Sequence, residues 1–184
     1  MGNPLQQRRT PAEFAAEAQL IEISAKVGDF EQLSEIIQTD LAALGADRMP
    51  PRWREQEVRG KLQFEFLDAQ QALPAVRGEV MATAAAVCQR CLGPFELQLT
   101  TSLNLLFAGE TAVESDGEEF EVWELEDEQL TIAELVEEAL IMAIPFVPMH
   151  AGDKNCVAVS EADSATEEMT LPFADLRAQM EREK

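Results

Sequence analysis

The chain has 184 residues, 46% of them hydrophobic, which is enough for one substantial core and predicts one domain with appendages. Its formal net charge is −21, from 35 acidic and 14 basic residues, and such a charge opposes nucleic-acid binding unless a local basic patch overrides it. No apolar run approaches the roughly 20 residues of a membrane span, and the N-terminus lacks the apolar segment of a secretory signal. We therefore expect a soluble cytoplasmic protein that does not contact a membrane.

The N-terminal half of the chain predicts two helices and two strands. The first helix is predicted to start at 10–13, where a cap residue, a first-turn proline and a capping-box glutamate follow one another. Alternating apolar residues then predict a strand over 20–27, after which Asp29 is expected to cap a helix that ends at Gly45. A second alternation predicts a strand over 61–68.

Two long alternating runs form the clearest pattern, with VRGEVMATAAAVC at 76–88 and FELQLTTSLNLLF at 95–107. Each run places its apolar residues on one face, which predicts a long hairpin whose tip, 88–94, carries two cysteines. Small residues on the first strand face large residues on the second. This arrangement would let a helix approach the sheet closely.

The C-terminal half begins with an acidic loop over 109–129, in which a strand is expected over 119–125. A helix should then run from a capping box at Thr131 until Pro145 stops it. The last segment, 158–184, is expected to be an acidic, partly flexible tail with a short amphipathic segment.

These elements predict a single α+β domain over 1–157. We expect an antiparallel, strongly curved sheet of about five to seven strands with two main helices packed on it, and closure of the sheet into a barrel is the alternative. The order of the strands does not follow from the sequence.

Cysteine and histidine are rare in this chain, with 3 cysteines and 1 histidine. Cys88 and Cys91 form a C-x-x-C at the hairpin tip, which is typical of a zinc knuckle, whereas a thioredoxin-like pair would need a helix after the second cysteine. His150 and Cys156 share one loop and could converge on the tip. These four ligands would close a structural zinc site with no open position, which argues against hydrolytic chemistry. Reduced, partly buried thiols and a surface histidine are the alternative.

Two charged patches suggest two kinds of partner. The helix after the acidic loop carries glutamates with no basic residue to pair with, and these could bind a basic protein or simply form a solvated face. A group of arginines around a tryptophan, with one arginine at the hairpin tip, could instead touch RNA, although surface charge usually serves solubility. The two sets are Glu134, Glu137 and Glu138, and Arg52, Trp53, Arg54 and Arg90.

No motif in the sequence indicates catalysis. The chain has no glycine-rich phosphate loop and no tyrosine, and its carboxylates are too dispersed to nominate a catalytic pair. Its one histidine cannot be both a zinc ligand and a general base. We expect no enzymatic activity, no small-molecule substrate and no cofactor besides one structural zinc. A zinc hydrolase would need an open coordination position.

Several segments together resemble one protein family, the YceD family of large ribosomal RNA subunit accumulation proteins, which is bacterial with plastid relatives. The segments are CQRCLGPFELQL, IAELVEEALIMAIPFVPMH followed by a cysteine, VSEAD and LPFADL. The N-terminal part agrees only in its arrangement of elements. The family's Cys-x-Arg-Cys and its glutamate-rich helix leading to Pro-x-His fall on Cys88, Arg90, Cys91, Glu137, Glu138, Pro145, Pro148 and His150. Ile144 and Ala139 are mild departures from the family pattern.

The resemblance implies a non-enzymatic role in the synthesis, processing or stability of 23S ribosomal RNA. Genes of the family commonly lie beside the gene for a small basic protein of the large ribosomal subunit, and this agrees with the partner that the charge suggests. We expect an acidic adaptor for a basic ribosomal protein or assembly factor, with 23S rRNA or its precursor contacted indirectly. The alternative is a direct RNA binder that uses the arginine and tryptophan patch with the zinc knuckle.

Overall fold

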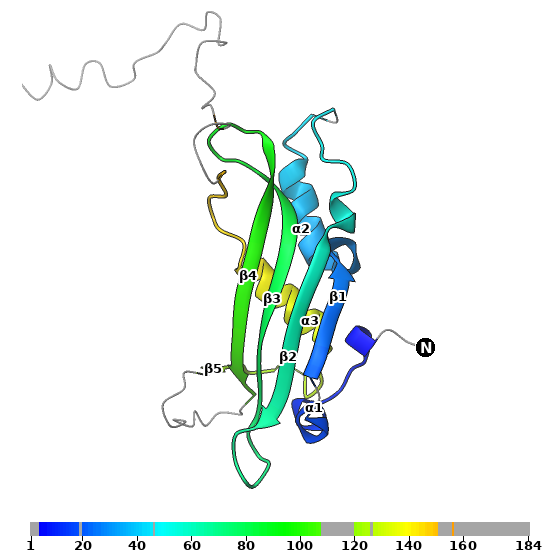
Figure 1. The fold of residues 1–184 in the computed structure, drawn as a ribbon, viewed down its shortest axis with the longest axis vertical. Helices are drawn as coiled ribbons and strands as arrows, with labels where there is room; N and C mark the ends of the chain where they lie inside the picture. The colour runs from blue at the N-terminus through cyan, green and yellow to red at the C-terminus, as the bar shows by residue number, and fades with distance from the viewer. Residues whose placement is uncertain are drawn as a thin grey trace, which may run out of the picture.

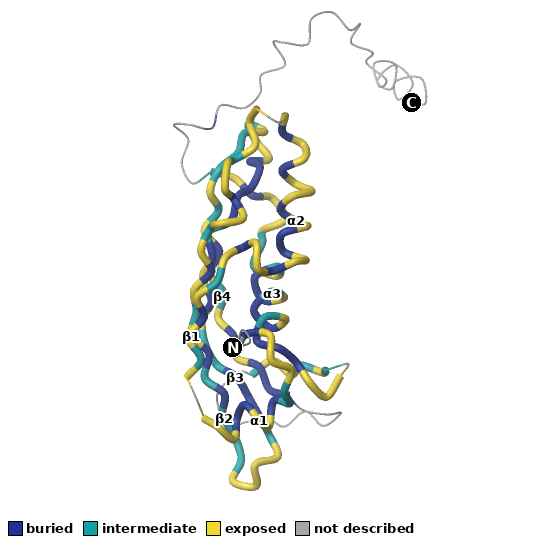
Figure 2. The backbone as a smooth tube through the Cα atoms, turned by 90° about the vertical axis from the view of Figure 1, so that its right-hand side faces the viewer, coloured by how far each residue is buried: buried dark blue, intermediate teal, exposed yellow. Residues whose placement is uncertain are grey.

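The structure is a computed structural model that describes residues 4–18, 20–45, 47–107, 120–125, 127–150 and 156. Within these ranges one five-stranded sheet has the order β1-β2-β3-β4-β5, and the α-helices cover one of its faces (Figures 1 and 2). The strands are β1 (Leu20–Lys26), β2 (Glu57–Phe66), β3 (Pro74–Val87), β4 (Pro94–Leu106) and β5 (Glu121–Val122). The helices are α1 (Pro11–Glu17), α2 (Glu31–Leu41) and α3 (Ile132–Met142), with 3-10 helices η1 (Pro4–Gln6), η2 (Val27–Asp29) and η3 (Trp53–Glu55).

The sheet confirms the expected α+β class. All neighbouring strands are antiparallel except β4 and β5, which pair in parallel. Among the described residues β1 and β5 stay at opposite edges, so the sheet is open and the barrel alternative is wrong.

The β3–β4 hairpin forms as predicted, with pairs running from Ala75↔Leu106 to Val87↔Pro94. Its apolar residues lie under the helices, and α2 packs on β3, the strand that carries the run of alanines. Gly78 lies on β3 opposite Leu62, and a Cβ at this position would overlap the carbonyl oxygen of Lys61. Only glycine therefore permits this close approach of β2 and β3.

Two of the three predicted helix starts are confirmed. Thr10 Oγ1 accepts from Glu13 N at 3.2 Å, and Thr131 Oγ1 accepts from Glu134 N at 3.0 Å. In each capping box the glutamate carboxylate accepts a hydrogen bond from the backbone N–H of the threonine.

The start of α2 differs from the expectation. Asp29 lies in η2, where its carboxylate accepts from Lys26 N at 2.8 Å, and the residue before α2 is Phe30, whose side chain makes no cap bond. The helix also ends at Leu41, before Gly45. The prediction that Asp29 caps this helix is therefore wrong, because η2 adds a turn that the apolar periodicity does not distinguish from the helix.

An aromatic series joins the sheet to the helices at the end of the sheet that holds α1. The ring centroids of Phe14 and Phe64 are 4.9 Å apart, those of Phe64 and Phe107 are 6.3 Å apart, and those of Phe107 and Trp123 are 6.4 Å apart. Phe64 is completely buried. These rings bury a large apolar area against one another and against the sheet.

Two predicted segments lie partly or wholly outside the described residues. The strand expected over 119–125 is represented by the two residues of β5, and much of the acidic loop, 108–119 and 126, is not described. The tail over 158–184 also lies outside the described residues. None of the helices in the described ranges has the length and apolar character that a membrane span requires.

Candidate metal centre

The tip of the β3–β4 hairpin is a tight turn that returns Cys91 toward Cys88. Cys88 N donates to Gly93 O at 2.9 Å, and Leu92 N donates to Cys88 O at 2.8 Å. Leu92 closes the turn in the left-handed region, with φ of 53°. The turn therefore fixes both cysteines on a short backbone loop, as a zinc knuckle requires.

The loop after α3 runs back to this turn. Gln89 N donates to Pro148 O at 2.9 Å, and the ring of His150 lies 4.8 Å from the ring of Phe95, measured between centroids. Cys156 is buried, and its Sγ lies 3.5 Å from Cys88 Sγ. Two segments that are far apart in the sequence, the hairpin and the loop after α3, thus meet at the hairpin tip.

The side chains of Cys88, Cys91, His150 and Cys156 form one cluster, with one ligand atom from each lying within 4.8 Å of the others. Cys91 Sγ is 3.7 Å from His150 Nδ1. Zn–S bonds of about 2.3 Å in a tetrahedral site put neighbouring ligand atoms about 3.5–3.8 Å apart. Both separations are close to this spacing, and the 3.5 Å between the sulfurs of Cys88 and Cys156 exceeds the roughly 2.05 Å of a disulfide bond. This cluster could hold a zinc ion.

The backbone around the cluster stabilises a thiolate. Burial alone would raise the pKa of Cys88, but backbone N–H groups of Cys91, His150 and Arg90 directed at its sulfur lower that pKa to about 5. Burial, together with the neighbouring sulfurs of Cys88 and Cys91, raises the pKa of Cys156 to about 11. Cys88 is therefore a ready anionic ligand at neutral pH, and a cation would favour ionisation of the remaining thiols.

The three glutamates singled out on α3 have different surroundings. Glu134 belongs to the capping box, and its Oε1 also lies 3.7 Å from Arg8 Nη2, so the expectation that no basic residue pairs with these glutamates is wrong at this position. Glu137 Oε1 accepts from Leu33 N at 2.9 Å. Glu138 is exposed and has no hydrogen bond or ion pair with the residues that the structure describes.

The contacts of Arg8 and Glu137 were not foreseen. Arg9 and Leu130 form an antiparallel bridge, with N–O distances of 3.1 and 2.9 Å, and this bridge holds Arg8 beside the start of α3. Glu137 supplies from α3 the acceptor that the first turn of α2 lacks. No local sequence signal indicates either contact, because each depends on how distant elements pack.

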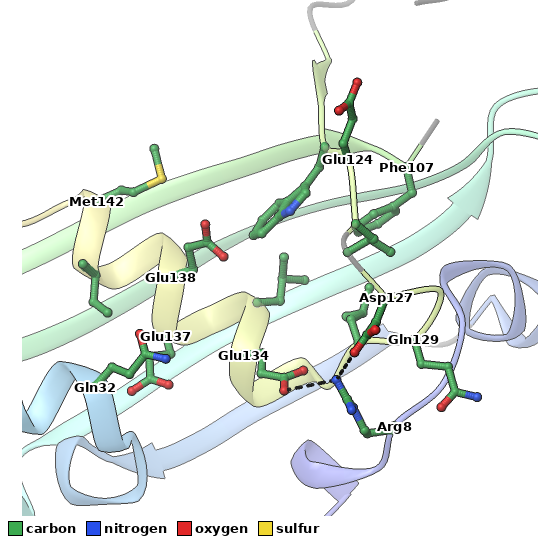
Figure 3. Close-up of a pocket in the computed structure, with 15 residues that line it drawn as sticks. Arg8, Gln32, Phe107, Glu124, Asp127, Gln129, Glu134, Glu137, Glu138 and Met142 are labelled. Carbon is green, nitrogen blue, oxygen red and sulfur yellow. Dashed lines mark hydrogen bonds and ion pairs between the residues drawn. The ribbon is translucent and has the colours of Figure 1, made fainter. Parts of the chain in front are cut away.

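Residues around the acidic face of α3 also line an open groove with a volume of about 680 Å³ (Figure 3). Its carboxylates come from α3 and from the segment that follows β5, and its apolar side chains come from both of these and from the end of β4. The lining residues include Arg8, Phe107, Trp123, Glu124, Asp127, Glu134, Glu137, Glu138, Ile141 and Met142. We call this the acidic groove.

The residues of the alternative RNA patch divide between the core and the surface. Trp53 is only 8% exposed, and the Arg54 guanidinium lies 4.6 Å from the centroid of its ring. Arg54 also donates to the side-chain oxygen of Gln38. Arg52 and the hairpin-tip residue Arg90 are exposed. The tryptophan ring thus packs inward, and the arginines are what this patch presents to solvent.

The model of one known protein family matches more than half of the chain. Residues 76–179 match the family model described as Large ribosomal RNA subunit accumulation protein YceD. The matched range contains all four residues of the cysteine and histidine cluster and the whole of α3. No solved structure matches the chain. The chain therefore belongs to the YceD family of large ribosomal RNA subunit accumulation proteins.

Proposed function

We propose that this protein promotes the accumulation of 23S rRNA during large-subunit assembly as a non-enzymatic, cytoplasmic adaptor for a basic ribosomal protein or assembly factor. Family membership supports the role in rRNA accumulation. The charge supports the mode of action, because the net charge is −21 and no lysine or arginine occurs between Arg90 and Lys154. This acidic stretch, which lies within the matched range, is the observation that carries the proposal.

An acidic surface favours a cationic protein over RNA for a physical reason. RNA binding gains most of its affinity when lysine and arginine neutralise phosphates, whereas carboxylates repel them. Single-stranded RNA also gains affinity by stacking its bases on exposed aromatic rings. The ring of Trp53 is buried, so Arg52, Arg54 and Arg90 would have to overcome the net charge without it.

The candidate metal centre supports a structural role for the end of the molecule that holds the hairpin tip. A zinc ion held by Cys88, Cys91, His150 and Cys156 would join the hairpin tip to the loop after α3. With four protein ligands the ion has no open position for water, so it would supply stability and no hydrolytic chemistry.

The proposed function is tested by direct binding. The purified full-length protein is offered total proteins extracted from large ribosomal subunits and, separately, naked 23S rRNA. We expect it to bind basic ribosomal proteins at low salt, to release them near molar salt, and to leave the RNA unbound. Tight capture of naked rRNA, weakened by Arg52→Ala and Arg54→Ala, with no basic protein bound, would support the RNA-binding alternative and contradict the adaptor.

A cellular measurement tests the role in accumulation. Removing the gene should lower the amount of 23S rRNA relative to 16S rRNA, and the wild-type gene should restore it. An unchanged ratio would contradict the proposal.

A further inference from the structure

The acidic groove combines negative charge with apolar surface. Glu124, Asp127, Glu134 and Glu138 are exposed at its rim, while Phe107 is buried beneath them. Trp123 and Ile141 are half-buried in its wall. Carboxylates above an apolar surface suit a lysine or arginine side chain, whose methylene stem can lie on the apolar part while its charge meets the rim.

A guanidinium group already occupies one end of the acidic groove. Arg8 Nη2 lies 3.4 Å from Asp127 Oδ2 and 3.7 Å from Glu134 Oε1 (Figure 3). Arg8 comes from the N-terminal segment, outside both elements that provide these carboxylates. Glu138 lies toward the other end, near Met142. The chain itself thus shows how a cation binds to this rim, and Glu138 at the far end has no ion pair with the part of the chain that the structure describes.

Exposed apolar residues follow along the chain from Met142 at that far end. Met142 lines the acidic groove and is 77% exposed, Phe146 is fully exposed, and Val147 and Met149 are 57% and 46% exposed. We call these four residues the apolar ridge. Single exposed apolar residues are ordinary, but four within eight positions are typical of a surface that another molecule covers.

The apolar ridge is held in place by the candidate metal centre. Pro148 is buried between ridge residues, and its carbonyl accepts the bond from Gln89 at the hairpin tip. His150, directly after the ridge, packs on Phe95 and lies in the cluster of ligands. The exposed side chains therefore project from a loop that is fixed at both ends, by α3 and by the cluster, which lowers the entropy lost when a partner binds.

Charge selects among the possible occupants of this surface. The C-terminal segment 157–184 has 7 acidic and 3 basic residues, and a second copy of the chain carries −21. Both would be repelled by the groove. A cationic partner gains from the same field, so the charge complementarity favours a basic polypeptide.

We propose that the acidic groove and the apolar ridge form one docking surface for a basic polypeptide segment whose lysine or arginine side chains alternate with apolar side chains. The basic side chains bind beside Glu138 in the acidic groove, and the apolar side chains cover Phe146 and its neighbours on the ridge. This inference rests on the proposed adaptor function and assigns its contact surface.

The test uses the full-length protein and two labelled synthetic peptides. In the first peptide lysine and arginine alternate with leucine and phenylalanine. In the second, which has the same charge, glycine and serine replace the apolar residues. Fluorescence anisotropy gives the dissociation constants, and we expect the first peptide to bind more tightly because only it covers the ridge.

Charge variants separate the acidic groove from the general field. Glu138→Lys should weaken binding of both peptides about tenfold, because it places a cation where the peptide's own cation binds. Glu35→Lys makes the same change in net charge at an exposed position of α2 outside the groove, and it should weaken binding about twofold or less. Equal losses in the two variants would overturn the groove assignment.

Apolar variants test the ridge in the same way. Phe146→Ser should weaken binding of the first peptide about tenfold and leave binding of the second unchanged, since only the first peptide has apolar side chains that bury the phenylalanine ring. The control is Met81→Ser, which changes an exposed apolar side chain on β3 and should alter neither constant. No difference between Phe146→Ser and Met81→Ser would overturn the ridge assignment.

Two further outcomes would identify a different occupant. Tighter peptide binding by Phe173→Ser in the full chain would mean that the chain's own tail covers the ridge, and a dimer that Phe146→Ser dissociates in sedimentation experiments would mean that a second copy does. Either result overturns the proposal.

If the groove and ridge variants still bind basic ribosomal proteins as the wild type does, this inference fails while the adaptor function stands. If wild-type protein binds no basic protein, the function itself fails.

Discussion

The two ends of the sheet hold different kinds of side-chain contact. At the α1 end, the rings of Phe14, Phe64 and Phe107 bury apolar area without strict directional requirements. At the hairpin tip, Cys88 and His150 belong to a cluster of few atoms whose value depends on distance, direction and ionisation. The first end should therefore respond to changes in side-chain volume, and the second to changes in ligand chemistry.

The strongest test of this comparison is Phe64→Ala at the apolar end. Phe64 is completely buried between two other rings, and removing it should lower the free energy of unfolding by about 3–5 kcal/mol. Urea unfolding measures the loss. Met81→Ala, on the exposed face of β3, is the control and should change stability by less than about 0.5 kcal/mol. A similar small effect at both positions would show that the aromatic series adds little to the free energy of unfolding.

The matching test at the other end is Cys88→Ser. Zinc content, measured by mass spectrometry of the tag-free protein, should fall from about one ion per chain to nearly none. At free zinc one hundred times the dissociation constant, the ion contributes about 2.7 kcal/mol to stability, and the variant should lose this amount. Removing zinc from the wild type with a chelator should cause the same loss, and the chelator should not affect the variant.

Hydrogen exchange shows whether the Cys88→Ser effect is confined to the tip. The amide of Gln89, which bonds to Pro148 O, should exchange faster in the variant. The amide of Leu62 in β2, which pairs with β1 and β3, should be little changed under native conditions. Retained zinc, or equal acceleration at both amides, would contradict the division into two differently stabilised ends.

Local chemistry explains which features the sequence predicted well. The capping boxes at Thr10 and Thr131 depend on residues three positions apart, and the β3–β4 hairpin depends on alternation within two continuous runs. The convergence of Cys88 and Cys156 was also predictable, because the chain has so few cysteine and histidine residues that only one four-ligand set exists.

Features that depend on tertiary packing were not predictable in the same way. Closure of the sheet depends on which strands become edges, and alternation within one strand carries no information about this. The same limit applies to Glu137: its place on an acidic helix face suggested a partner site, whereas its carboxylate accepts from the backbone of α2. The pairing of Arg8 with Glu134 likewise depends on the bridge between Arg9 and Leu130.

The smallest predicted effect distinguishes two adjacent glutamates on α3. Glu137→Ala should lower the free energy of unfolding by about 0.5–2 kcal/mol, because Leu33 N in the first turn of α2 loses its acceptor and Phe30 offers none. Glu138→Ala should change it by less than about 0.5 kcal/mol. Glu137→Gln keeps a carbonyl acceptor and should recover part of the loss, although it gives up the charge that favours a helix N-terminus. Equal effects of the two alanine substitutions in urea unfolding would mean that the contact between α3 and α2 adds nothing to stability. Glu137 and Glu138 would then be equivalent surface charges, as the sequence pattern alone suggested.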